Sequence, residues 1–242
     1  MRSEAWTSTV RPVVASAGDV VRALLDAVGP RGTVVVPTYT AGNSDPSRWA
    51  FTRGRAVPRW QRAWLRARMP AFDPAITPSQ RMGAVAEAVR TWPGARRSDH
   101  PQTSFAAVGA HADDVVDGHA RDCHLGPASP LGRLHDRDAQ VLLLGVPWAV
   151  CSAFHLAEYL VPDPPTRDYE CVVRDGGGRA WYRYRDVLLD DGDFQQLGEA
   201  MEEDGGVRRA RVGEAVTRLF PIRDAVAFAS GRFAAGRPAQ RR

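Results

Sequence analysis

The chain has 242 residues, of which 44% are hydrophobic and 25% are charged, and these values are ordinary for a globular protein with a sizeable core. It holds no apolar run near the about 20 residues that a membrane helix needs, and its first residues lack the basic and apolar regions of a secretory signal, so we expect a cytoplasmic protein. Three widely spaced cysteines argue against a disulfide framework or a zinc ribbon, and the net charge of +4 is carried by arginine without any lysine.

The first predicted elements are a helix and a strand. Residues 18–32 repeat apolar side chains at helical spacing after an acidic cap, Asp19, and they stop at Gly29 and Pro30, a common helix end. Residues 33–40 (TVVVPTYT) form a β-branched run of the kind that makes a buried strand.

Residues 59–68 (RWQRAWLRAR) allow two interpretations. Arginines interleaved with tryptophans are typical of a surface that binds phosphates or nucleic acid. The same spacing describes an amphipathic helix in which Trp60 and Trp64 are one turn apart and pack inward. We favour the helix, and because the other arginines are scattered among acidic residues we predict no nucleic-acid partner.

Helices and strands then alternate along the chain. The predicted elements are a capped helix over 77–94, buried strands over 104–109 and 140–146, and helices over 193–205 and 212–229. Residues 170–187 alternate apolar and polar side chains around a triple glycine, which is a strong hairpin signal. This pattern predicts an α/β fold: a single domain with a mixed central sheet flanked by helices, plus a C-terminal hairpin and helices. We place this domain at 1–236 and expect a disordered tail at 237–242.

Four of the six histidines give weak functional signals. His111 and His119 lie among aspartates and are expected on a solvated face, and His135 is expected to be exposed in a turn. Residues 119–124 (HARDCH) bring two histidines and a cysteine together, but no second cluster completes four zinc ligands, so we predict no metal. Cys123 and the histidine after it lack the signature of a cysteine nucleophile.

Two histidines give stronger signals, and each leaves an alternative open. His100 precedes a proline and is surrounded by arginine and hydroxyl side chains, which suits either a site for phosphates or a thioester carbonyl, or a surface turn. If Ser152 caps a helix, His155 and Glu158 share a helical face three residues apart. A histidine beside apolar residues and oriented by a carboxylate makes a plausible general base, and the alternative is a core histidine satisfied by its neighbour.

Four ordered stretches of the chain resemble one known family. They are GPRGTVVVPTYT (29–40), a long stretch from MPAFDP to GAHAD (69–113), LGPASPLGRLHDRDAQVLLLGV (125–146) and FHLAE (154–158). With a similar C-terminal region, they resemble the aminoglycoside 3-N-acetyltransferase family, antibiotic acetyltransferases unrelated to the GNAT fold, over nearly the whole chain. The resemblance implies direct acetyl transfer from acetyl-CoA to a primary amine of an aminoglycoside, without an acyl-enzyme and without a metal.

The resemblance also implies roles for individual residues. His155 matches the family's catalytic histidine, and Glu158 is the adjacent candidate for orienting it. Asp186 roughly matches an acidic position near the amine, for which Asp190 is an alternative, and Asp73 is expected near the acceptor or the cofactor. The residues that match the cofactor-contacting segment are Arg97, Ser98, His100, Ser104 and Phe105.

Two departures from the family's pattern leave alternatives open to the predicted activity. The family has a first strand with a V-H-x-S-L segment, and residues 7–21 already match the part of the family that comes after that strand, so we expect the strand to be missing. Cys151 and Ser152 stand where the family has Asn-Thr. The alternatives are therefore an acetyltransferase of another biosynthetic amine, or a catalytically weakened homologue that binds an aminoglycoside or CoA. We expect a monomer or homodimer without membrane or nucleic-acid partners.

Overall fold

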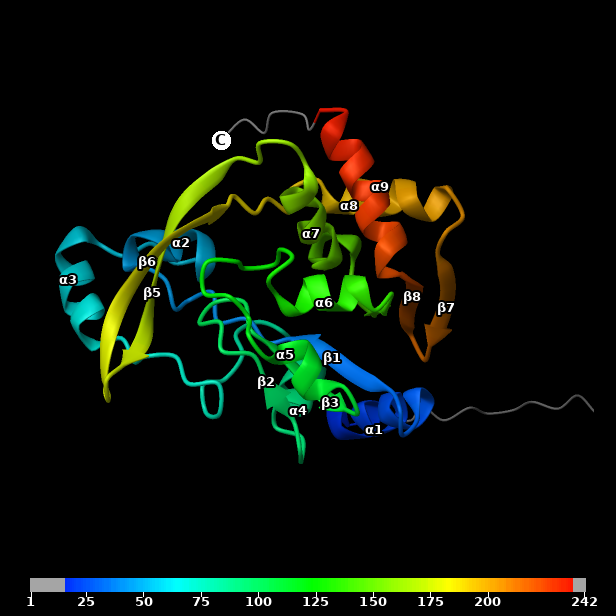
Figure 1. Ribbon diagram of the computed structural model, residues 1–242, viewed down its shortest axis with the longest axis horizontal. Helices are drawn as coiled ribbons and strands as arrows, with labels where there is room; N and C mark the ends of the chain where they lie inside the picture. Colours follow the sequence, from blue (N-terminus) through cyan, green and yellow to red (C-terminus); the bar gives the residue numbers. More distant parts are fainter. Residues whose placement is uncertain (1–15, 237–242) are drawn as a thin grey trace, which may run out of the picture.

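The computed structural model describes residues 16–236, and it combines helices with three small sheets (Figure 1). The helices are α1 (Ala17–Val28), α2 (Trp49–Thr52), α3 (Arg59–Arg68), α4 (Ala84–Arg90), α5 (Ala112–Val116), α6 (Pro130–Asp136), α7 (Ala153–Leu160), α8 (Phe194–Glu203) and α9 (Ile222–Ala234), with 3-10 turns η1 (Pro46–Arg48) and η2 (Trp148–Val150). The strands are β1 (Thr33–Pro37), β2 (Arg96–Arg97), β3 (Phe105–Gly109), β4 (Gln140–Leu144), β5 (Thr166–Asp175), β6 (Gly178–Val187), β7 (Arg208–Val212) and β8 (Ala215–Pro221).

The predicted α/β class is confirmed, but the strands form separate antiparallel sheets instead of the predicted mixed central sheet. Within the described residues they form sheets in the orders β1-β3-β2, β4-β8-β7 and β5-β6, and each pair is antiparallel. Two predictions, the missing first strand and the disordered tail at 237–242, lie outside the part of the chain that the structure describes.

The first sheet is covered by α1 and α4, which pack on it around Val21, Val34 and Val89. The helix α1 begins at Ala17, before the predicted cap Asp19, so the predicted start and cap are wrong. Ser16 is the N-cap, and Asp19 completes a capping box from the third helical position, because its carboxylate bonds back to the Ser16 backbone.

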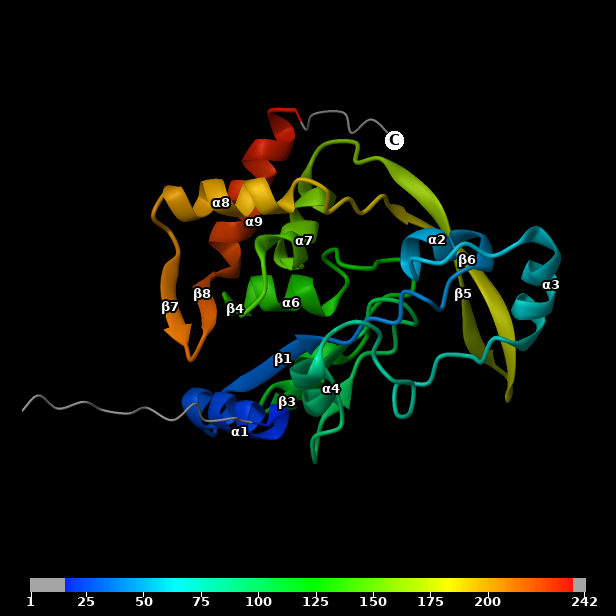
Figure 2. The same cartoon turned by 180° about the vertical axis from the view of Figure 1, so that it is seen from behind.

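The second sheet packs with α7, α8 and α9 around the largest apolar core of the described residues (Figure 2). Trp148, Phe154 and Phe220 are fully buried in it. The prediction of a helix over 212–229 is wrong in its first half, since those residues form the end of β7 and β8 before α9 begins at Ile222. Pairing of β8 with β4 outweighed the helical spacing that the sequence shows.

The predicted hairpin is confirmed as β5 and β6, which pair over ten residues each. Gly176 and Gly177 connect them with φ of 49° and 85°, a left-handed backbone that favours glycine. In Figure 1 the hairpin extends away from the core helices and lies beside α2 and α3.

The helix α3 forms as predicted, but its tryptophans do not pack inward. Trp60 is 78% exposed and Trp64 is 56% exposed, and no residue of α3 is buried. Arg66 fixes the helix instead, through ion pairs with Asp45 and Glu170 and through stacking on a tryptophan of the hairpin. No helix among the described residues is long and apolar enough to cross a membrane.

Candidate active site

The predicted pair of His155 and Glu158 is present on α7. His155 Nδ1 lies 2.7 Å from Glu158 Oε2, and both side chains are largely buried. Ser152 occupies the N-cap position but makes no capping hydrogen bond from its side chain, so the predicted cap is wrong. The first turn of α7 instead follows directly from η2, whose Trp148 is buried in the core.

Both carboxylate oxygens of Glu158 are engaged by hydrogen bonds. Its second oxygen, Oε1, accepts a hydrogen bond of 3.0 Å from the backbone N–H of Asp190. The ring of Phe194 packs against the His155 ring at 4.7 Å between centroids. With Nδ1 engaged by the carboxylate, Nε2 is the ring nitrogen available to a substrate, and this arrangement can accept a proton.

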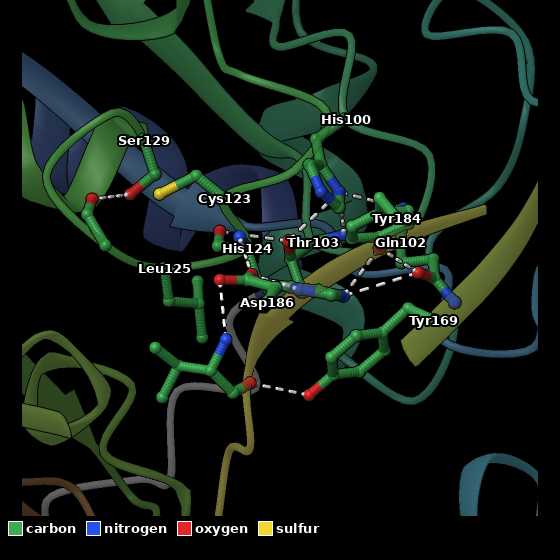
Figure 3. A network of polar contacts seen from close by, with 12 residues as sticks. His100, Gln102, Thr103, Cys123, His124, Leu125, Ser129, Tyr169, Tyr184 and Asp186 are labelled. Atoms are coloured by element: carbon green, nitrogen blue, oxygen red, sulfur yellow. Dashed lines mark hydrogen bonds and ion pairs between the residues drawn. The ribbon is translucent and has the colours of Figure 1, made fainter. Parts of the chain in front are cut away.

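A second histidine–carboxylate pair, absent from the sequence-based predictions, lies beside the first. His124 Nδ1 is 2.6 Å from Asp186 Oδ2, and the backbone N–H of His124 donates to the same oxygen at 2.7 Å. On the other side of the ring, Nε2 contacts the hydroxyl of Tyr184 at 2.9 Å and the amide oxygen of Gln102 at 3.3 Å (Figure 3). This imidazole is engaged at both nitrogens by the protein itself.

Asp186 accepts hydrogen bonds from two different parts of the chain. Besides His124, its Oδ2 accepts a 2.7 Å hydrogen bond from the hydroxyl of Tyr159, and Tyr159 lies on α7. Burial raises the pKa of Asp186, but the hydrogen bonds from His124 and Tyr159 outweigh that effect and hold it below its ordinary value. Asp186 therefore connects β6 to the helix that carries His155.

Three histidines lie together in the interior, which excludes the surface-turn alternative for His100 and contradicts the prediction for His119. His100 is fully buried, so it is not in a surface turn, and His119 is buried where a solvated face was expected. The His100 ring lies 4.6 Å from that of His119 and 4.9 Å from that of His124. Burial lowers the pKa of His100 well below its ordinary value and that of His119 to about 4.

The other two histidines lie at the surface or near it. His111 is exposed as predicted, and His135 is half-buried. Among residues 16–236, no group of three histidine, cysteine, aspartate or glutamate side chains is placed to hold a metal ion.

A cavity of about 580 Å³ opens beside His124. It lies between the loop that follows β1 and the hairpin, and His124, Gln102 and Thr103 form part of its wall. Leu189 also lines it, and this residue directly precedes Asp190, whose N–H binds Glu158. Leu189 thus connects the wall along the chain to the residue that binds Glu158, while His155 and Glu158 themselves are not part of the wall.

The charged residues in the wall of the cavity carry both signs. They are Asp45, Arg48, Arg66, Arg167, Asp168, Glu170 and Arg183. Asp190, the predicted alternative to Asp186 near the amine, is not part of this wall.

The segment predicted to contact the cofactor forms an internal network. The Arg97 guanidinium donates to the carbonyl oxygens of Thr38 and Thr77 and to the Ser104 hydroxyl. Ser98 Oγ lies 3.0 Å from His119 Nδ1. Phe105 packs in the core, and none of the five predicted side chains lines the cavity beside His124 or a smaller one beside Asp73.

Asp73 lies at this smaller cavity of about 250 Å³, which Val173 and Arg174 of the hairpin strand β5 also line. Its carboxylate forms an ion pair with Arg174 and accepts a hydrogen bond from the Ala75 backbone at 2.9 Å. These two contacts fix the turn that leads toward α4.

The amino-acid sequence of the chain is similar to those of known proteins. Residues 5–234 match the family model of aminoglycoside 3-N-acetyltransferases. The chain is 38% identical over 240 residues to aminoglycoside N(3)-acetyltransferase VII of Streptomyces paromomycinus, covering 91% of this chain and 80% of the relative.

Two solved structures are also similar to this chain. The crystal structure of the YokD protein of Bacillus subtilis superposes with a TM-score of 0.85 at 35% identity, covering 91% of this chain and 85% of that one. The binary complex of AAC-IIIb with CoASH superposes with a TM-score of 0.77 at 27% identity, covering 93% and 86%.

Proposed function

Because the chain belongs to the aminoglycoside 3-N-acetyltransferase family, we propose that it transfers an acetyl group from acetyl-CoA to the 3-amino group of an aminoglycoside, with His155 as general base. Family membership makes the chain an N-acetyltransferase. The observation that carries the assignment of the base is the buried pair of His155 and Glu158, with Nε2 left for the substrate. We also propose the cytoplasm as the compartment, since acetyl-CoA is available there.

The chemistry needs a base at this place. An alkylammonium group must lose a proton before its nitrogen can attack a thioester. In the proposed step the ammonium group first releases one proton to solvent, and His155 Nε2 takes a second proton from the neutral amine while its nitrogen bonds to the carbonyl carbon of the acetyl group. The carbon–sulfur bond then breaks, CoA leaves as the thiolate, and the proton passes to the sulfur. The Glu158 carboxylate stabilises the imidazolium that exists between the two proton transfers.

The cavity beside His124 is the proposed acceptor site. Its support is its size, which lies in the range of small-molecule sites, and the presence of Leu189 in its wall, since Leu189 directly precedes the residue that binds Glu158. For Asp186 we propose a positioning role through Tyr159 on α7 rather than contact with the amine. Asp190 is proposed to act through its backbone N–H on Glu158.

The donor contacts remain proposals drawn from the resemblance. Arg97, Ser98, His100, Ser104 and Phe105 match the cofactor-contacting segment of the family. Because Arg97 and Ser98 are engaged by hydrogen bonds within the protein, the role proposed for this segment is to position the residues that contact acetyl-CoA. AAC-IIIb, a structural neighbour, binds CoASH.

The test is release of CoA thiol from acetyl-CoA with a panel of aminoglycosides, for the natural chain and for His155→Ala. We expect turnover with at least one aminoglycoside and a loss of about 100-fold or more in kcat for the variant, since general base catalysis contributes about 10²–10⁴-fold. Turnover that survives His155→Ala removes this residue from its role. Aminoglycoside binding by calorimetry without thiol release favours a homologue that binds and does not catalyse.

A further inference from the structure

We propose that the acceptor pocket of this protein selects an amine that also carries an anionic group, such as a phosphate, which the guanidinium groups of Arg48 and Arg167 bind. The inference rests on the proposed function, because it takes the cavity beside His124 as the acceptor site. It names the class of acceptor that this pocket fits.

The carboxylates in the wall of the cavity are already neutralised by arginines of the protein. Arg66 forms ion pairs with Asp45 and with Glu170, the latter at 2.8 Å. Glu170 accepts a second ion pair, of 2.7 Å, from Arg183. These paired carboxylates offer little attraction to an acceptor that carries only positive charges.

The third carboxylate of the wall has a partner as well. Asp168 lies 3.7 Å from the guanidinium of Arg185, and both side chains are exposed. An exposed pair of this kind is screened by solvent and contributes little field to the cavity.

Two arginines of the wall have no carboxylate partner among residues 16–236. They are Arg48, at the end of η1, and Arg167, near the start of β5. The Nε of Arg167 is buried and makes no hydrogen bond within the described residues, while its guanidinium lies over the Tyr169 ring at 4.3 Å from the centroid. A buried guanidinium N–H without an acceptor is costly unless a ligand supplies one.

The balance of charge in the pocket follows from these contacts. The wall holds four arginines and three carboxylates, and the carboxylates are engaged by Arg66, Arg183 and Arg185. Arg48 and Arg167 therefore leave positive charge directed to a bound molecule. Guanidinium groups present paired donors that match the oxygens of a phosphate or a carboxylate, so an acceptor with one such group and one amine fits the pocket.

The experiment compares matched acceptors that differ by one phosphate. We would measure kcat and KM with glucosamine and glucosamine 6-phosphate, and with an aminoglycoside and its O-phosphorylated form, at saturating acetyl-CoA. We expect a KM for each phosphorylated acceptor at least tenfold lower than for its partner. Arg167→Gln and Arg48→Gln should each remove most of this preference by raising the KM of the phosphorylated acceptor about tenfold, while kcat changes little.

A control variant and a binding measurement separate this inference from the proposed function. Arg22→Gln, on the exposed face of α1, removes an arginine far from the pocket and should leave the preference unchanged. Calorimetry with glucosamine 6-phosphate on the His155→Ala protein should still show tighter binding than glucosamine, because binding of the acceptor does not require the proposed base. Failure of every acceptor to be acetylated contradicts the proposed function, whereas preserved binding preference supports the pocket's selectivity independently.

Three results would overturn the inference. One is equal KM values for phosphorylated and unphosphorylated acceptors. Another is a KM for acetyl-CoA, rather than for the acceptor, that rises in the arginine variants, since the pocket would then hold phosphates of the donor. The last is competition by inorganic phosphate as strong as that by the phosphorylated acceptor, since the site would then bind a free anion only.

Discussion

Glu158→Gln is the substitution that tests the role of the histidine–carboxylate pair most directly. The amide has the same shape as the carboxylate but carries no charge. The carboxylate binds His155 Nδ1 at 2.7 Å through one oxygen and accepts from the Asp190 N–H at 3.0 Å through the other. The amide oxygen can serve only one of these donors, and its NH₂ group then faces the other.

The size of the effect depends on the role of the charge during the reaction. When His155 takes the proton in the variant, the imidazolium lacks a charge-assisted hydrogen bond, which is worth about 1.5–3 kcal/mol. A factor of ten in rate corresponds to about 1.4 kcal/mol, so kcat should fall by about 10- to 100-fold. The KM of the acceptor should change much less, because neutral histidine is the form that binds the substrate.

The assay is thiol release from acetyl-CoA at saturating acceptor, together with urea unfolding of the same preparations. Glu199→Gln is a matched control, since this carboxylate lies on the exposed face of α8 and bonds only Gln195 at 2.7 Å among the described residues. It should retain full activity. A kcat for Glu158→Gln within threefold of the natural chain, with unfolding unchanged, would refute the assigned role of the carboxylate.

Three further predictions concern stability. Histidines of the unfolded chain take up a proton near pH 6.5, whereas burial lowers the pKa of His119 to about 4 and that of His100 well below its ordinary value. The contribution of these two buried histidines to the free energy of unfolding is therefore complete above pH 6.5 and is lost as the pH falls toward 4. These two histidines should together lower the unfolding free energy from urea titrations by up to about 2.7 kcal/mol per pH unit in that window, and His119→Gln should reduce the slope by about 1.4 kcal/mol per pH unit; an unchanged slope contradicts this. Gly198→Ala should destabilise by about 1–3 kcal/mol or more, because its Cβ would overlap the Trp148 ring, whereas Gly231→Ala on α9 meets open space and should not destabilise when both are compared by thermal unfolding. Trp60→Ala and Trp64→Ala should each change the unfolding free energy by less than about 0.5 kcal/mol, because both side chains are exposed, and a loss of about 2 kcal/mol or more would show that α3 is packed in solution.

The elements that were predicted well are those whose signals are local. The β-branched run at β1 and the glycine turn between β5 and β6 each specify backbone conformation within a few residues. The failures came where tertiary pairing decided the outcome. Residues 215–221 have helical spacing, but their backbone groups pair with β4, so they form β8.

In the candidate site, too, one contact follows from local sequence spacing and another depends on tertiary packing. His155 and Glu158 are three residues apart on one helix, so their contact follows from the sequence once a helix is accepted. His124 and Asp186 are 62 residues apart, and only the packing of β6 against the loop before α6 brings them together. No spacing rule could have selected this pair from the chain.

The sequence by itself determined the family, the α/β class and the His155–Glu158 pair on α7, because ordered motifs and helical periodicity are local patterns of neighbouring residues. The tertiary structure decided which charges face the cavity. Each carboxylate of its wall is neutralised by an arginine that folding brings beside it, as Glu170 is by Arg66, and these two residues lie 104 positions apart in the chain. The charge balance of a pocket depends on residues that are distant in the chain and that folding brings into contact, so composition and local sequence pattern cannot specify this balance.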